Sequence, residues 1–170
     1  MTAVISVTES LILTGIRSWI LSLITCEVAS GLANRVAMPK DPCIIFTPLD
    51  KTRYSTNVNT YDHTTKKFVE AHFLQAVQLD CYGPASSDWA TILATMWRGD
   101  DAVTFLTGSG ITPLWADDPL QVPFVSGEQQ YEVHWTLKIH LQYNPVISTT
   151  QDFSDSATVQ ITDAERAYNP

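Results

Sequence analysis

The sequence predicts an α/β domain of the α+β kind, in which a mixed or antiparallel sheet is flanked by helices. Three observations predict it. Apolar residues recur at helical spacing in two segments, they alternate with polar residues in two others, and Gly and Pro residues separate these segments. The chain has 170 residues, of which 45% are hydrophobic, so it is long and apolar enough for one buried core. We therefore expect a single domain over residues 1–170.

The first helix is expected within residues 6–30. Ser6 and Glu9 have the spacing of a capping box, in which each side chain bonds the backbone N–H of the other residue. Gly31 marks the expected end of the helix. Apolar residues recur at helical spacing after the cap, at Ile12, Ile16, Trp19, Ile20, Leu23 and Ile24.

Strands are predicted next along the chain. The apolar run at residues 43–46 lies between two prolines and is typical of a short buried strand. Alternation at residues 54–60 is strand-like, and residues 62–64 favour a turn. From Ala71 to Tyr82 apolar and polar residues alternate more regularly, which predicts a second strand.

A second helix is predicted after the break at Gly83-Pro84. Ser86, Ser87 and Asp88 are candidates for its N-cap, and Gly99 is the candidate for its C-cap. A further helical turn is expected from Asp101 to Leu106. One face of the second helix is apolar, with Trp89, Ile92, Leu93, Met96 and Trp97.

Residues 108–130 are expected to form an extended loop or a hairpin arm, because three prolines and Gly127 leave room only for short strands. The strict alternation from Tyr131 to Tyr143 then predicts a strand of about 13 residues, roughly 43 Å long. Such a strand either continues into a neighbour's sheet or bends around its own domain. Residues 146–170 are expected to supply an edge strand, at Ala157–Ile161, and a C-terminal tail.

The charge is negative overall and unevenly distributed. With a net charge of −8 the protein lacks the electrostatic attraction that drives non-specific binding to nucleic acid. Residues 35–67 hold six basic and three acidic residues, or +3, whereas residues 99–137 hold six acidic residues and no Lys or Arg. A basic and an acidic region on one chain would suit head-to-tail assembly of copies. The alternative is that both regions are ordinary solvated loops. No segment reads as a membrane span or a leader peptide.

Patterns that carry chemistry are missing from the sequence. It has no phosphate-binding glycine motif, GxSxG or HExxH, and its three cysteines form no CxxC pair. His134 and His140 lie on one face of the predicted strand but roughly 20 Å apart, too far for a shared metal, and we expect both at the solvent or at an interface. We expect no catalytic, cofactor or metal site. The alternative is a Cys/His site built from Asp62-His63 and Asp80-Cys81, in which Cys81 would be the nucleophile.

A candidate interface follows from the aromatic and charged residues. Four of the five tryptophans lie on predicted core faces, whereas Trp115 lies in the proline-rich segment and belongs either to a local core or to a partner contact. Asp117-Asp118 is better interpreted as an exposed acidic turn than as a carboxylate pair for catalysis. The candidate contact residues are Trp115, Asp117, Asp118, Phe124 and Glu128, facing Arg53, Lys66 and Lys67 of another subunit.

Several short segments form a recognisable set, namely Val77–Pro84, Asp88–Ala90, Pro113–Pro119, Gly127–Tyr131 and His140–Pro145. Taken together, over roughly residues 30–155, they resemble the phage neck terminator family of tailed bacteriophages. The resemblance implies a tail-terminator-like fold and a structural protein of the virion neck, made in the cytoplasm of the bacterial host. It also implies a homo-oligomer, a hexameric ring that caps the tail tube and stops its polymerisation.

The resemblance further implies the partners of such a ring. They are the tail tube protein, the head-tail connector and other neck proteins, and a sheath if the tail is contractile. DNA would pass the lumen without specific binding, and an acidic lumen would repel its phosphates. Two other functions stay open at this point, namely a head-closure or minor tail protein and the Cys/His enzyme.

Overall fold

The computed structural model describes residues 2–32, 39–40, 42–62, 65–125 and 131–152. A mixed six-stranded sheet forms the body of the molecule, with strand order β2-β3-β6-β11-β7 and with β8 also paired to β11. All pairs are antiparallel except β2 with β3. The strands are β2 (Glu27–Ser30), β3 (Cys43–Arg53), β6 (Phe73–Tyr82), β7 (Ile111–Ala116), β8 (Leu120–Gln121) and β11 (His134–Tyr143). The predicted α+β class with a mixed sheet is thus confirmed.

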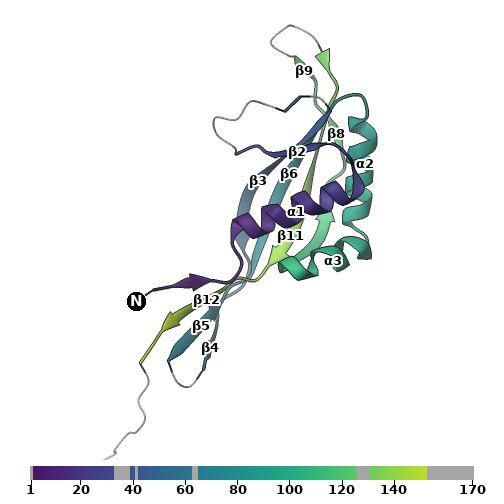
Figure 1. Ribbon diagram of the computed structural model, residues 1–170. Helices are drawn as coiled ribbons and strands as arrows, with labels where there is room; N and C mark the ends of the chain where they lie inside the picture. Colours follow the sequence, from purple (N-terminus) through teal and green to yellow (C-terminus); the bar gives the residue numbers. More distant parts are fainter. Residues whose placement is uncertain (1, 33–38, 41, 63–64, 126–130, 153–170) are drawn as a thin grey trace, which may run out of the picture.

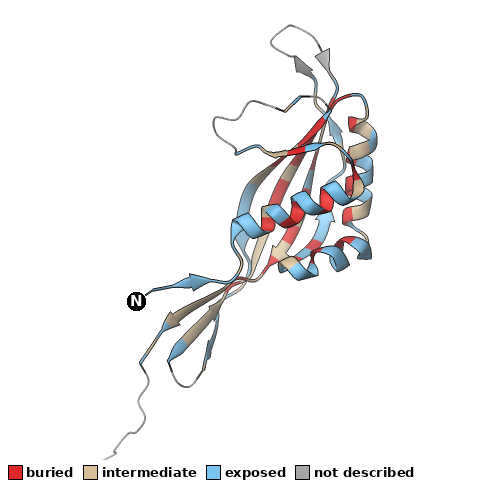
Figure 2. Ribbon diagram, in the orientation of Figure 1, coloured by how far each residue is buried: buried red, intermediate tan, exposed pale blue. Residues whose placement is uncertain are grey.

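Helices cover one face of this sheet (Figure 1). They are α1 (Glu9–Leu23), α2 (Ser86–Trp97) and α3 (Asp100–Leu106), and a 3-10 turn, η1 (Thr107–Ser109), follows α3. The core lies between the helices and the sheet, as the buried residues in Figure 2 show. Trp19 of α1 and Trp97 of α2 meet edge to face there, with ring centroids 4.9 Å apart. Trp97 Nε1 also donates to the carbonyl of His140 in β11, at 3.1 Å.

Two smaller sheets lie at the ends of the body (Figure 1). One is a four-stranded sheet of order β1-β12-β5-β4, which projects beyond the helices. Its strands are β1 (Val4–Ile5), β4 (Val58–Tyr61), β5 (Lys66–Glu70) and β12 (Val146–Thr150). The other is a hairpin of β9 (Phe124–Val125) and β10 (Tyr131–Glu132) at the opposite end.

The N-terminal helix is shorter than predicted. It begins after Thr8, whose Oγ1 accepts from the Leu11 N–H, so Thr8 and not Ser6 is the N-cap. It ends at Leu23, and residues 27–30 form β2 beside β3. Four residues are too few to show a period of their own, and the pairing of Val28 with Ile44 in β3 decides their conformation.

The ends of the second helix also differ from expectation. Ala85 is the N-cap of α2, and Ser86 lies inside the helix. Gly99 caps the start of α3 rather than the end of α2, with φ of −88°, so α2 and α3 follow one another almost directly. On the predicted apolar face Leu93 and Trp97 are buried, whereas Ile92 is exposed. Helical spacing identified the helix and its core residues but left the caps undecided.

The segment predicted as a loop or arm is divided between two structures. Ile111–Ala116 is a strand of the body sheet, paired with β11, and only the β9–β10 hairpin corresponds to an arm. Pro113 is tolerated in β7 because β7 lies at the edge of the sheet. β11 pairs with β6 along all ten residues and with β7 and β8 on its other side. The predicted strand of about 13 residues is therefore two strands, β10 and the ten-residue β11, and β11 is paired within one chain and does not by itself indicate a neighbour.

The C-terminal part contains a strand that alternation did not reveal. β12 follows Asn144-Pro145 and pairs with both β1 and β5, so it is an inner strand of the small sheet. The predicted edge strand at residues 157–161 lies outside the described residues.

Candidate interaction surfaces

The edge of the body sheet formed by β7 and β8 exposes apolar side chains, Leu114, Trp115 and Leu120. Trp115 lies opposite His140 of β11, and their rings stack with centroids 4.4 Å apart. Trp115 is nevertheless 45% exposed. It therefore lies at the surface of the sheet edge, and half-exposed aromatic residues of this kind are common at partner contacts.

The acidic pair after β7 has partners within its own chain. Asp117 Oδ1 lies 3.2 Å from Nε2 of His140, and Asp118 Oδ1 lies 3.4 Å from the guanidinium of Arg98. Arg98 also donates to the carbonyl of Ala116. The two carboxylates thus reach different partners, and the side chain of Asp118 is 95% exposed.

The remaining candidate residues belong to other parts of the chain. Phe124 belongs to β9, and Glu128 lies outside the described residues. Lys66 and Lys67 belong to β5, and Arg53 ends β3, where its Nε donates to the carbonyl of Ser55. Lys67 lies roughly 35 Å along the strands from the level of Asp117. The acidic and basic groups therefore do not meet within one chain.

The four-stranded sheet has no buried residue in any of its strands. The pairing register places apolar residues on both of its faces. One, called here the Tyr61 face, has Ile5, Tyr61, Lys67, Val69 and Ile147. The other, the Val58 face, has Val4, Val58, Lys66, Phe68, Glu70 and Val146.

A sheet with apolar side chains on a face is stable when another layer covers that face. Among the described residues no helix or second sheet covers either face of this one (Figure 2). Exposed apolar surface of this kind is typical of an interaction site.

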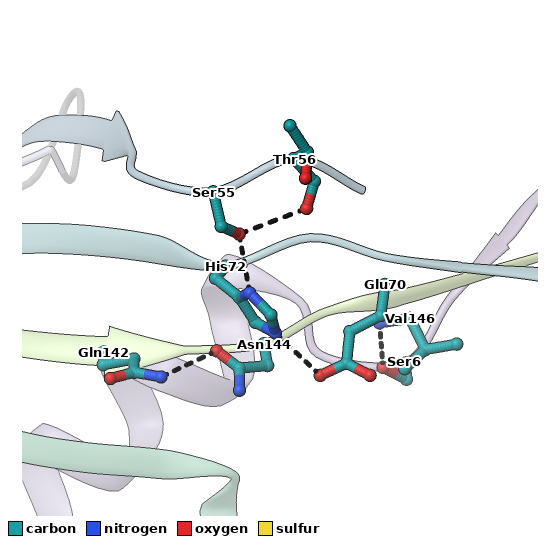
Figure 3. Close-up of polar contacts among 8 residues, drawn as sticks. All are labelled: Ser6, Ser55, Thr56, Glu70, His72, Gln142, Asn144 and Val146. Atoms are coloured by element: carbon teal, nitrogen blue, oxygen red, sulfur yellow. Dashed lines mark hydrogen bonds and ion pairs between the residues drawn. The ribbon is translucent and has the colours of Figure 1, made fainter. Parts of the chain in front are cut away.

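A polar network fixes the small sheet to the body where β5 leads into β6 and β11 leads into β12 (Figure 3). His72 Nδ1 lies 2.6 Å from Ser55 Oγ, and its Nε2 lies 3.1 Å from Glu70 Oε1. Ser6 Oγ accepts from the Val146 N–H at 2.9 Å. Side chains from three separate segments thus hold the bend between the two sheets.

A buried ionisable pair lies on the face of the body sheet opposite the helices. Asp80 Oδ1 is 3.2 Å from His134 Nε2, and the Tyr82 ring stacks on His134 with centroids 4.4 Å apart. Gln78 Nε2 donates to both oxygens of Asp80. The expectation that His134 lies at the solvent or at an interface is therefore wrong, because the residue is only 8% exposed and packs against Asp80 and the Tyr82 ring within its own chain.

Cys81 does not have the properties of a nucleophile. It packs in the core on the helix-covered side of β6, whereas Asp80 and His134 lie on the other side. Burial raises the pKa of the Cys81 thiol to about 12, with a further contribution from the Asp80 carboxylate. A thiol with such a pKa stays protonated near neutral pH, and the thiolate is the reactive form. His63, the other candidate of that site, lies outside the described residues.

Within the described part of the chain, no three His, Cys, Asp or Glu residues are grouped so as to hold a metal ion. No described helix is both long and apolar enough to cross a membrane.

Sequence reasoning missed the small sheet as a unit and the His72 network at its root. A signal for β12 was present, since Val146–Thr150 has four β-branched residues directly after Pro145. No comparable signal marks His72, whose partners Ser55 and Glu70 are recognisable only once the strands are paired.

Comparison with known families gives one match that spans most of the chain. No curated protein matches the sequence. Residues 10–165 match the family model described as phage neck terminator protein.

Proposed function

Because the chain belongs to the phage neck terminator family, a family of structural proteins, we propose that it forms a ring that caps the tail tube and joins the tail to the head. The match over residues 10–165 carries this proposal, since it covers nearly all of the helices, the whole body sheet, and every strand of the small sheet except β1. The proposed location is the neck of the virion, which the family membership supports.

The uncovered four-stranded sheet supports assembly into a ring. A ring repeats one head-to-tail contact, so each copy needs two different surfaces that are exposed in the single chain. The small sheet is one such surface, and exposed apolar side chains elsewhere in the molecule, on the helices and on β7 and β8, can supply the second. Six copies are proposed from the family resemblance alone, because β11 is fully paired within its chain and gives no support.

The partners proposed are a second copy of this chain, the tail tube protein and the neck proteins on the head side, with a sheath if the tail is contractile. DNA passes the lumen without specific binding, in keeping with the net charge of −8. The Trp115 edge remains the proposed contact for one of these proteins, with Trp115 as its apolar anchor and Asp117 and Asp118 at its rim.

An amber mutation in the gene tests the proposal. Without the protein, we expect heads and tails that do not join, and tails of irregular length in negative-stain micrographs, because nothing stops the growing tube. Tails of uniform length attached to heads would contradict the capping role.

A cryo-EM reconstruction of the neck tests the ring itself. We expect a closed ring of this chain between the tail tube and the head-side neck proteins. A single copy on the axis would contradict the proposed ring. A ring bound only to the head would indicate a head-closure protein instead.

A further inference from the structure

A groove runs between α1 and the α3–η1 segment on the helix-covered side of the body. Its volume is about 520 Å³, and Leu11, Gly15, Ser18, Phe105 and Gly108 are among its lining residues. All of its lining residues are uncharged. Leu11 and Phe105 are 52% and 47% exposed, so two large apolar side chains stand open at this groove. An open apolar groove next to exposed apolar residues is a candidate protein contact.

Acidic residues border the groove on α3. Asp101 precedes Phe105 by four residues, which places the two side chains next to each other on one side of the helix. Neither Asp100 nor Asp101 forms an ion pair with any of the described residues, unlike Asp117 and Asp118. A complementary surface would therefore be apolar and carry a positive charge beside the apolar part.

The Tyr61 face of the small sheet has this chemistry. It carries Ile5, Tyr61, Val69 and Ile147, and its one charged side chain is Lys67, whose ammonium lies 6.0 Å from the centroid of the Tyr61 ring. The Val58 face suits the groove less well, because Glu70 lies on it and would approach the acids of α3.

The two surfaces do not meet within one chain. Tyr61 pairs with Lys67, three residues further toward the tip than the Val58–Glu70 pair at the root. The sheet extends away from the helices, so its tip lies beyond the reach of its own groove (Figure 1). Two complementary surfaces at different places on one chain generate a head-to-tail contact between copies.

We propose that the Tyr61 face of one copy docks into the α1–α3 groove of the next copy, with Lys67 opposite Asp101. This inference rests on the proposed ring and specifies its contact. Tyr61 inserts next to Leu11 and Phe105, and the Lys67–Asp101 pair sets the register.

Photo-crosslinking in assembled particles tests the contact directly. With p-benzoylphenylalanine placed at Tyr61, we expect irradiation to give a dimer of this chain, crosslinked within residues 9–18 or 100–110 of the second copy. The same group placed at Tyr54, which is exposed at the root of the sheet, serves as the control and should not crosslink to these ranges. A crosslink from Tyr61 to another virion protein or to another part of this chain, or no crosslink, would overturn the proposal.

A charge exchange gives a second, independent test. Lys67→Asp and Asp101→Lys should each lower the yield of joined particles about tenfold, because like charges then face each other. The double variant should recover most of the yield, whereas Lys40→Asp and Asp88→Lys, which change exposed charges elsewhere, should have little effect. Failure of the double variant to recover would count against the pairing.

Asp101→Lys also places a positive charge at the first turn of α3, where it opposes the helix dipole. Phe105→Ala avoids this complication and should reduce the Tyr61 crosslink several-fold, and an undiminished crosslink would count against the groove. A ring whose Tyr61 crosslinks map elsewhere would refute this contact and leave the proposed function standing, whereas the absence of any ring in the neck would refute both.

Discussion

The body sheet and the small sheet are built from consecutive parts of the same chain segments, yet only the body sheet has a core. β5 leads into β6 and β11 leads into β12, so the same pair of chain segments crosses both sheets. Every odd-numbered residue from Val77 to Cys81 in β6 is fully buried, whereas no residue of β5 or β12 is buried. Similar strand sequences thus become either a core or a surface for assembly, depending on whether helices cover them.

The difference arises from where the helices attach. α2 follows β6 directly through Gly83, which has a positive φ of 108°, and turns back over β6 and β11. α1 and α3 pack beside it. At the other end, β5 connects to β6 through Ala71 and His72. Among the described residues no helix covers the small sheet, which is held by strand pairing and by the hydrogen bonds at its root.

The largest expected effect is in the body. Trp97→Ala should lower the free energy of unfolding by about 3–5 kcal/mol, because it leaves a cavity between α2 and the sheet and removes the contact with Trp19. Urea unfolding followed by circular dichroism measures this. Trp97→Phe is the milder control, since it keeps a ring in the core. A loss below about 1 kcal/mol for the alanine variant would mean that the body does not depend on this contact.

The Trp115 edge should affect assembly more than folding. Trp115→Ala should weaken assembly by about 2 kcal/mol or more, whereas Asp117→Asn should cost about 0–1 kcal/mol, as for exposed charge pairs. The yield of joined particles measures the first effect, and circular dichroism of the isolated variants shows whether they fold. Normal particle yield from a folded Trp115→Ala protein would remove Trp115 from the interface.

A substitution at the bend between the two sheets should destabilise only the small sheet. His72→Ala removes hydrogen bonds to Ser55 and Glu70 and should destabilise the small sheet by about 1–2 kcal/mol. Hydrogen exchange followed by mass spectrometry should show faster exchange in β5 and β12 and unchanged exchange in β6 and β11. Uniformly faster exchange would show instead that the two sheets unfold as one unit.

The smallest effect on stability is expected at the tip of the small sheet. Tyr61→Ser should change the free energy of unfolding of the isolated protein by only about 0.5 kcal/mol, since Tyr61 is 43% exposed there. Thermal unfolding of the wild type and the variant gives this difference. A loss of 2 kcal/mol or more would show that Tyr61 belongs to a core within the chain and would weaken the comparison between the two sheets.

The long periodic segments could be predicted from the sequence. The alternation at Tyr131–Tyr143 and Ala71–Tyr82 identified the two central strands, and the helical spacing of Leu93 and Trp97 identified α2. These elements are long enough for the burial of one face to impose its period on the sequence. The family was recognised separately, by the resemblance of short segments that include parts of β6, α2, β7 and β11, and the family model matches residues 10–165.

What only the tertiary structure decided is which segments pair and which faces are covered. The conformation of residues 27–30 depends on β3, and the strand at residues 111–116 depends on β11, although its proline favours a loop. His72 contacts Ser55 from a separate segment as well as Glu70 of β5, His134 contacts Asp80 of β6, and no described helix covers Tyr61. The spacing of apolar residues predicts that one face of a helix or strand is covered. The residues that cover this face lie far away in the chain or in another subunit, so the spacing does not identify them.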